Sequence, residues 1–243
     1  MELRGKIALV TGAGQRVGRA IGLSLAQAGC DLVAHYHASA DGARDLSRDA
    51  QGLGVRAIAF QADLTDPAEL RRLFETIDTS MGGLDILVNS AAIMHRRDLR
   101  DVSEADWHAT IDLNLKAAFF CVQEAALRMS KRGGGVIVNI GDVAGARPWP
   151  RFPVHSISKA GVEMLTQVAA LSLAPSIRVN AVAPGPVLRP DSMSETRWES
   201  IVSSLPLHRS GTPQDVAEAV LFLLRNDYLT GTTLPIDGGS QLG

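Results

Sequence analysis

The sequence predicts a doubly wound α/β fold, built on a parallel sheet of about seven strands, in a single domain that spans residues 1–243. Short apolar runs alternate with amphipathic segments along the whole chain, which is typical of strands joined by helices. Most of these runs are continuously apolar, as expected for parallel strands that are covered on both faces. With 243 residues, 46% of them hydrophobic, the chain is long and apolar enough for one such core.

The strands are expected where the apolar runs fall. They cover Ile7–Thr11, Asp31–His37, Arg56–Gln61, Asp85–Asn89, Gly135–Ile140, Arg178–Ala183 and Thr233–Ile236. Helix starts are marked at Asp66 and Thr212, each of which is followed by proline and then by an acidic residue at the third position. The longest irregular stretch, from Pro184 to about Glu195, is rich in proline and polar residues and is expected to form a mobile lid beside a site.

Two predicted helices, Leu113–Met129 and Ile157–Leu173, are apolar nearly all the way round. A surface helix has a single apolar stripe, so burial on several sides indicates a subunit interface. We therefore expect a homotetramer, or at least a dimer. The alternative is a monomer that buries both helices within its own domain.

Composition excludes several classes of partner. The formal net charge of −2 gives no electrostatic reason to expect nucleic acid or an anionic membrane. Cys30 and Cys121 lie in apolar surroundings without metal-ligand spacing, and we expect core thiols in a reducing compartment. The first strand begins close to Met1, and no apolar run approaches membrane-spanning length. A soluble, cytoplasmic protein is expected.

The first strand ends in three closely spaced glycines, Gly12, Gly14 and Gly18, and a helical pattern follows at once. A strand that turns through glycines into a helix brings backbone N–H groups and the positive helix end to a diphosphate. The turn thus predicts a dinucleotide site in a Rossmann-type fold, with an ordinary tight strand–helix turn as the alternative.

The end of the second strand indicates which dinucleotide is preferred. An Asp or Glu there would hold the adenosine ribose hydroxyls, but the sequence reads His35-Tyr36-His37-Ala38-Ser39. Arg16, His37 and Ser39 could instead surround a 2′-phosphate, so NADP(H) is the expected cofactor. The two histidines lack further ligands at plausible spacing, and no metal site is expected.

The chain resembles the short-chain dehydrogenase/reductase family over essentially its whole length. The matching motifs are Thr11-Gly12 through Gly18, Asp63-Leu64, Asn89-Ser90-Ala91-Ala92, Asn114 in Leu-Asn-Leu, Val138-Asn139-Ile140, Lys159, Arg178-Val179-Asn180, Pro184-Gly185, and Leu229-Thr230-Gly231 with Ile236-Asp237-Gly238-Gly239.

The resemblance implies that Asp63 and Leu64 cradle adenine, that the turn from Asn89 lines the cofactor, and that the loop after Pro184 closes over nicotinamide and substrate. Together with the residues above, the expected cofactor contacts are Gly12, Gly14, Arg16, Val17, Gly18, His37, Ser39, Asp63, Leu64, Asn89, Ser90, Ala91, Lys159, Pro184, Gly185 and Val187.

Within that family, three features are similar to the pteridine reductase branch: Arg16 at a glycine position, the His-Tyr-His-x-Ser segment, and Asp142 at the position of the usual catalytic Ser. The match is partial, because that branch holds the pterin with a Ser and an aromatic ring, where this chain has Ala91 and Ile93. A 3-oxoacyl-carrier-protein reductase is a further alternative, favoured by general similarity and by loop arginines.

The resemblance also places apolar residues around the substrate. The expected wall consists of Met94, Trp149, Phe152, Met193 and Trp198, and the arginines that could meet an anionic substrate or carrier are Arg96, Arg97, Arg147 and Arg151. Arginines on loops are, however, more often simply solvated.

The main departure from the family concerns the proton donor, since the Tyr expected four residues before Lys159 is replaced by His155. The spacing from Asp142 to His155 matches the family's Ser-to-Tyr spacing, so the two are expected to face one substrate oxygen. A carboxylate favours a protonated imidazole, whereas Lys159 disfavours it. The expected roles are ribose orientation by Lys159, a proton-relay water on Asn114, and proton supply by Asp142 with His155.

The sequence therefore predicts an NADP(H)-dependent oxidoreductase that reduces a carbonyl or an activated double bond in a small organic substrate. The alternative is a catalytically impaired cofactor-binding protein, a sensor or an oligomer partner, in which the tyrosine was lost together with the activity.

Overall fold

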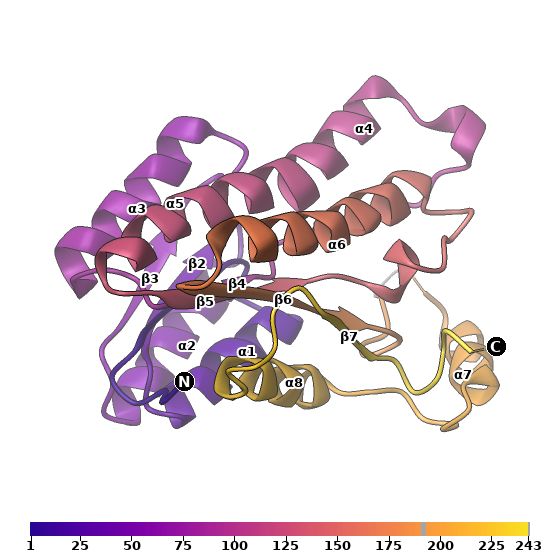
Figure 1. Cartoon of the computed structure of the whole chain (residues 1–243). Helices are drawn as coiled ribbons and strands as arrows, with labels where there is room; N and C mark the ends of the chain where they lie inside the picture. The colour runs from indigo at the N-terminus through magenta and orange to yellow at the C-terminus, as the bar shows by residue number, and fades with distance from the viewer. Residues whose placement is uncertain (191–192, 243) are drawn as a thin grey trace.

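The computed structural model describes residues 1–190 and 193–242, and within them a seven-stranded parallel sheet lies between two layers of helices (Figure 1). The strand order is β3-β2-β1-β4-β5-β6-β7. The strands are β1 Ile7–Val10, β2 Asp31–Tyr36, β3 Ala57–Gln61, β4 Ile86–Asn89, β5 Gly135–Ile140, β6 Ile177–Pro184 and β7 Thr233–Ile236. The predicted doubly wound α/β fold is confirmed, and each predicted strand end lies within one residue of the observed one.

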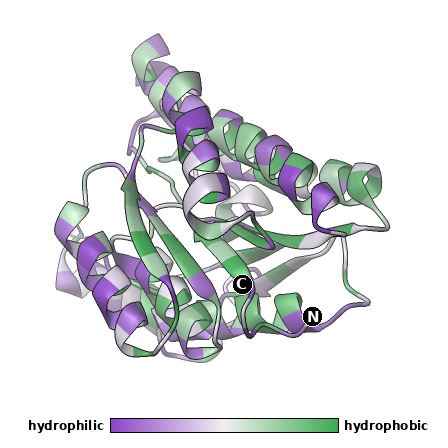
Figure 2. Ribbon diagram, turned by 90° about the vertical axis from the view of Figure 1, so that its left-hand side faces the viewer, coloured by the Kyte–Doolittle hydropathy of each residue, from purple (hydrophilic) through white to green (hydrophobic). Residues whose placement is uncertain are grey.

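Two hydrophobic cores, one on each face of the sheet, explain why the strands are continuously apolar. Along β1, Ala8 and Val10 belong to one core, and Ile7 and Leu9 belong to the other. Figure 2 shows strands that are hydrophobic along much of their length between helices of mixed character. Both cysteines are buried, and burial raises the pKa of each thiol to about 12.

The helices divide between the two faces (Figure 1). One face carries α1 (Arg16–Gln27), α2 (Ala40–Gly52) and α8 (Pro213–Arg225). The other carries α3 (Pro67–Met81), α5 (Ala118–Lys131) and α6 (Pro153–Leu173), with α4 (Glu104–Ile111) and α7 (Glu195–Ser204) near the strand ends. The predicted caps are present: Asp66 accepts a hydrogen bond from the Ala68 N–H, and Thr212 forms a capping box with Asp215.

The two predicted all-apolar helices differ from expectation in their starts. A π-helical turn, Asp112–Ala117, precedes α5, so the expected helix Leu113–Met129 is divided. The other helix, α6, begins at Pro153, four residues before the expected Ile157. The subunit leaves part of both helices uncovered, because Leu127 on α5 is 57% exposed and Leu171 on α6 is 84% exposed. The described residues contain no helix long and apolar enough to cross a membrane.

A buried histidine holds the glycine turn in place. His35 on β2 is 1% exposed, and its Nδ1 accepts a hydrogen bond from the Gly12 N–H at 3.2 Å. The ring proton therefore resides on Nε2, which donates to the Ala62 carbonyl at 3.0 Å. Burial lowers the pKa of His35 to about 4, so the ring is neutral at pH 7. Its structural role was not expected from the sequence.

This burial makes the stability of the protein sensitive to acid. Below the ordinary histidine pKa of about 6.5, the unfolded chain binds a proton that the folded chain excludes until the pH approaches 4. Stability should therefore fall by about 2 kcal/mol between pH 7 and pH 5 through His35 alone. In His35→Leu this loss of stability between pH 7 and pH 5 should disappear. The free energy of unfolding at pH 7 should also drop by about 1–3 kcal/mol, because the Gly12 N–H loses its acceptor.

Urea unfolding of the cofactor-free protein at both pH values measures the effect. The control is His37→Asn, since His37 is exposed at the end of the same strand. An unchanged acid dependence in His35→Leu would show that another group is responsible.

Candidate active site

A cavity of about 1470 Å³ opens at the carboxyl ends of the central strands. The chain leaves β1 toward β2 on one side, and β4 pairs with β1 on the other, so the cavity lies where the winding direction reverses. Ligands of doubly wound sheets bind at this point. The volume exceeds the range of about 300–1,000 Å³ that is usual for one small ligand. It therefore accommodates a dinucleotide together with a substrate.

Most of the predicted site residues lie on the wall of this cavity. They are Gly12, Gly14, Arg16, Val17, Gly18, His37, Ser39, Asp63, Leu64, Ser90, Ala91, Asp142, His155, Lys159, Pro184, Gly185 and Val187. Of the predicted set, Asn89 and Asn114 are set back from the wall. Residues 191 and 192 of the predicted lid lie outside the described residues.

The glycine turn is required by the packing of the chain itself. Gly12 has a φ of +66°, a backbone conformation that side chains disfavour. A Cβ on Gly14 would overlap Ser39, and a Cβ on Gly18 would overlap the carbonyl of Gly12. The sequence alone attributed these glycines to the approach of a diphosphate. The structure shows that at least two of them are needed before any ligand binds.

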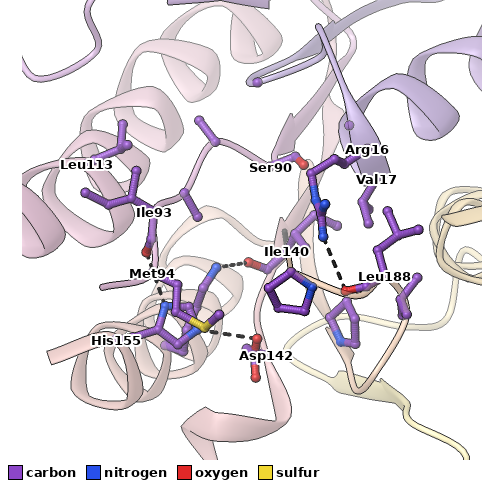
Figure 3. A pocket seen from close by; sticks show the side chains of 18 of the residues that line it. Arg16, Val17, Ser90, Ile93, Met94, Leu113, Ile140, Asp142, His155 and Leu188 are labelled. Carbon is purple, nitrogen blue, oxygen red and sulfur yellow. Dashed lines mark hydrogen bonds and ion pairs between the residues drawn. The ribbon is translucent and has the colours of Figure 1, made fainter. Parts of the chain in front are cut away.

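Arg16 occupies the middle of the same turn in a left-handed conformation, with a φ of +52°. Its guanidinium Nη2 donates to the carbonyl of Leu188 at 3.3 Å, which links the turn to the segment after β6 (Figure 3). His37 and Ser39 border the cavity from the end of β2. The three residues proposed from the sequence for a 2′-phosphate thus share one cavity, with Arg16 directed across it.

Asp142 and His155 lie side by side at the end of β5 and the start of α6 (Figure 3). The Nε2 of His155 is 3.4 Å from Oδ2 of Asp142, and its Nδ1 is 3.3 Å from the carbonyl oxygen of Ile93. Both neighbours are hydrogen-bond acceptors. The doubly protonated ring, with an N–H on each nitrogen, is therefore the form that satisfies both of them.

The carboxylate of Asp142 is held by the backbone. Its Oδ1 accepts a hydrogen bond from the Ala144 N–H at 2.8 Å and caps the short helical turn Val143–Gly145. This leaves Oδ2 for His155. The imidazole is only 4% exposed, and the ring of Trp149 stacks on it at 6.5 Å between centroids. Asp142 thus places a carboxylate oxygen beside a nearly buried imidazole.

Lys159 follows His155 by one turn on the same side of α6, and it is 5% exposed. Its Nζ donates to the carbonyl of Ile140 at 2.7 Å. Burial lowers the pKa of Lys159 to about 8, and the negative charge of Asp142 limits that decrease. The ammonium group is therefore mostly protonated at pH 7.

Asn114 and Asn89 use their side chains inside the protein. Asn114 accepts from the Ile93 N–H and donates to the Ile93 carbonyl, both at 2.9 Å, and it donates its second N–H to Ser158. Asn89 donates to Asn139 at 2.9 Å. Both amide N–H donors of Asn114 are thus occupied, so the side chain fixes the Ile93 backbone. The proton-relay water expected on Asn114 stays a prediction. The π-helical turn that carries Asn114 could not be read from the sequence.

The substrate end of the cavity is apolar and aromatic. All five residues expected there line it: Met94, Trp149, Phe152, Met193 and Trp198. Sequence reasoning missed Arg197 and Ile201, which line the same cavity from α7. The sequence pattern could have indicated them, because Arg197 and Ile201 are four residues apart, next to Trp198, and therefore lie on one face of a helix just beyond the predicted lid.

The four loop arginines proposed from the sequence separate into two groups. Arg96 and Arg151 line the cavity. Arg97 pairs with Asp106 at 3.1 Å, and Arg147 donates to the carbonyl of Ser240 at 2.8 Å. The hypothesis that all four meet a ligand is therefore wrong for these last two, whose charged groups are engaged within the protein.

Comparison with known proteins identifies the family of the chain. The family described as "Enoyl-(Acyl carrier protein) reductase" matches residues 12–241. A "Short-chain type dehydrogenase/reductase" of Picea abies is 36% identical in an alignment of 251 residues that covers 98% of this chain and 93% of the relative. A 3-oxoacyl-[acyl-carrier-protein] reductase FabG of Staphylococcus aureus is 37% identical in an alignment of 242 residues that covers 98% of each chain.

A solved structure, described as a short-chain alcohol dehydrogenase from Sinorhizobium meliloti 1021, superimposes with a TM-score of 0.94. It is 32% identical in sequence, and the match covers 100% of this chain and 98% of that one. The chain belongs to the short-chain dehydrogenase/reductase family of oxidoreductases.

Proposed function

We propose that this protein is an NADP(H)-dependent reductase that acts on a carbonyl group or an activated double bond in a small organic substrate. The observation that carries the proposal is the position of His155 between two acceptors, Asp142 and the carbonyl of Ile93, on the wall of the cavity. That arrangement favours a ring that carries a proton it can donate.

The residues on the cavity wall fit a phosphorylated dinucleotide. Gly12 supplies a left-handed turn after β1, and α1 begins four residues later at Arg16. Arg16, His37 and Ser39 offer a cation and hydrogen-bond donors, and residues 35–39 contain no carboxylate that would repel a 2′-phosphate. A bound nicotinamide cofactor would supply a hydride.

The protein's own groups would supply the proton. Reduction of a carbonyl adds a hydride to carbon and a proton to oxygen, and His155 can release the proton from Nε2 to an oxygen that takes the place of Asp142 as its acceptor. Asp142 stabilises the imidazolium before transfer. The ammonium of Lys159 stabilises negative charge on the oxygen and would orient the nicotinamide ribose.

Three alternative functions are each favoured by a particular observation. Replacement of the family's Tyr by His155 favours a cofactor-binding protein without turnover. Similarity to FabG favours 3-oxoacyl-carrier-protein substrates. A pteridine substrate is favoured by Arg16 and Asp142, whereas Ala91 and Ile93 on the cavity wall provide no ring for it to stack on.

We also propose that the protein is a homotetramer, or at least a dimer, formed through α5 and α6. The supporting observation is the apolar surface that one subunit leaves exposed on these helices, formed by Phe119, Phe120, Leu127, Ile157, Met164, Val168 and Leu171.

NADP(H) should bind more tightly than NAD(H). Loss of a charge-assisted contact to the 2′-phosphate costs about 1.5–3 kcal/mol, or about 10–150-fold in affinity. Arg16→Gly should lose that preference without backbone strain, because glycine tolerates the left-handed φ at this position. Calorimetric titration of both cofactors measures the change. Arg19→Gln is the control, since Arg19 lies on the same helix and pairs with Asp49. Equal affinities in the wild type would contradict the assignment.

Turnover should depend on the Asp142–His155 pair. In Asp142→Asn the imidazolium loses its counter-charge, and kcat at pH 7 should fall by about tenfold or more with little change in cofactor affinity. His155→Tyr should raise turnover by about tenfold or more, because Lys159 then acts on the donor that the family uses. Steady-state kinetics on a panel of carbonyl compounds with NADPH measures both, with Asp98→Asn as an exposed control.

If Asp142→Asn leaves kcat unchanged, the pair is not the proton source. If the wild type is inactive and only His155→Tyr turns over, the alternative without turnover is correct.

The oligomer can be tested by mass. Light scattering at micromolar concentration should give about two or four times the chain mass of 25.8 kDa. Leu171→Glu should shift the mass toward the monomer, because it places a charge on the exposed apolar face of α6. Leu53→Glu, at an exposed leucine next to α2, should not. A wild-type mass near 25.8 kDa would refute the interface.

A further inference from the structure

Three arginines line the same cavity as the apolar and aromatic residues of the substrate wall. Arg96 follows β4, Arg151 precedes α6, and Arg197 lies on α7. The backbone N–H of Arg97 donates to the carbonyl of Arg151 at 3.0 Å, so the segments that carry Arg96 and Arg151 run side by side. Three different elements thus bring positive charge to one opening.

Unlike several other arginines, these three have no side-chain partner among the described residues, and unlike Arg100 they line the cavity. Arg97 is paired with Asp106, Arg128 with Asp78 and Glu124, and Arg132 with Asp85. Across residues 1–190 and 193–242, the side chains of Arg96, Arg151 and Arg197 form no ion pair and no hydrogen bond. Their donors are available to a ligand.

Among the described residues that line this end of the cavity, the positive charges outnumber the negative ones. Among the described lining residues there, the carboxylate is that of Asp142, and it is engaged with His155 and the Ala144 N–H. The chain as a whole has a net charge of −2, so general basicity does not explain the cluster. A local excess of positive charge in a partly enclosed site attracts an anion.

The surface between the arginines and His155 is apolar. Trp149 contacts Phe152 edge to face at 6.0 Å and stacks on His155 at 6.5 Å. Met94, Met193 and Trp198 complete this wall. A ligand that spans it therefore requires an apolar body, with the reacting oxygen at His155 and its charge at the arginines.

We propose that the substrate is an oxo acid: a ketone or aldehyde whose apolar body lies against the wall of Trp149 and Phe152, and whose carboxylate binds Arg96, Arg151 and Arg197. The proposal rests on the reductase function above and specifies its substrate class. Arginine presents a planar set of N–H donors that fits a carboxylate in a bidentate manner. The reduction converts the ketone and one proton, with a hydride from the cofactor, to the hydroxy acid.

The test compares two probes that share one aryl ketone body: 4-benzoylbutyrate, which carries a carboxylate, and its methyl ester, which is neutral and one methyl group larger. With NADPH, kcat/KM should be about 10–150-fold higher for the acid, the equivalent of one charge-assisted contact. The preference should fall toward unity in Arg151→Gln, Arg96→Gln or Arg197→Gln, and Arg151→Lys should retain part of it. The matched control is Arg100→Gln, since Arg100 is exposed on the turn Leu99–Asp101 and is not part of the wall.

Calorimetric titration of both probes into the protein with oxidised cofactor gives a second readout that needs no turnover. Arginine-dependent binding of the acid without reduction of either probe would support the oxo-acid site and contradict the reductase function. Equal reduction of acid and ester, unaffected by the three arginine variants, would overturn the oxo-acid site and leave the reductase function standing.

A third probe, acetoacetyl-coenzyme A, distinguishes a carboxylate from a phosphate source of negative charge. If this thioester alone shows arginine-dependent kcat/KM, while acid and ester are equal, the oxo-acid proposal is wrong and the site serves carrier-bound substrates. Failure to bind any of the three probes would likewise overturn it.

Discussion

The contact between Asp142 and His155 depends on two backbone groups that hold its members in place. The Ala144 N–H binds one oxygen of the carboxylate and leaves the other for the imidazole. The Ile93 carbonyl fixes the opposite ring nitrogen, and Asn114 clamps Ile93 from both its N–H and its carbonyl. The ring is thus oriented by the ends of β4 and β5 and by the π-helical turn before α5. Its chemistry is set by groups that do not themselves react.

Burial of Lys159 beside Asp142 lowers the stability of the fold. Its ammonium group is buried with one hydrogen-bond acceptor, the carbonyl of Ile140, and its pKa is lowered to about 8. Because the unfolded chain keeps a lysine protonated up to about pH 10.4, burial opposes folding below pH 8, and the penalty is relieved as the pH rises between these values. Asp142 reduces the penalty. One carboxylate therefore both contacts the His155 ring and lowers the cost of burying the Lys159 ammonium group.

The sequence was sufficient for the fold and for the spacing of the reactive residues. Apolar runs of strand length predicted all seven strands, and motif order placed Asp142, His155 and Lys159 on one cavity. The sequence was not sufficient where contacts between distant segments determine the position of a side chain. The π-helical turn directs Asn114 to Ile93, and no local pattern indicates it. Burial of His35 beneath the Gly12 turn, like the pairing of Arg97 with Asp106, depends on segments that are brought together only by folding.

The cofactor half and the substrate half of the cavity are formed by different kinds of segment. The residues proposed for the reaction therefore lie apart from those proposed to select the substrate. The proposed dinucleotide side and the proposed proton-transfer groups lie at strand ends or on α6, next to the sheet and the two cores. The substrate wall comes instead from the connections after β4 and β5 and from α7, where side chains contact the cavity more than the core. Changes in such segments alter what binds without moving the reacting atoms. Since the unpaired arginines lie in these segments, relatives with the same fold can reduce different substrates with the same cofactor geometry.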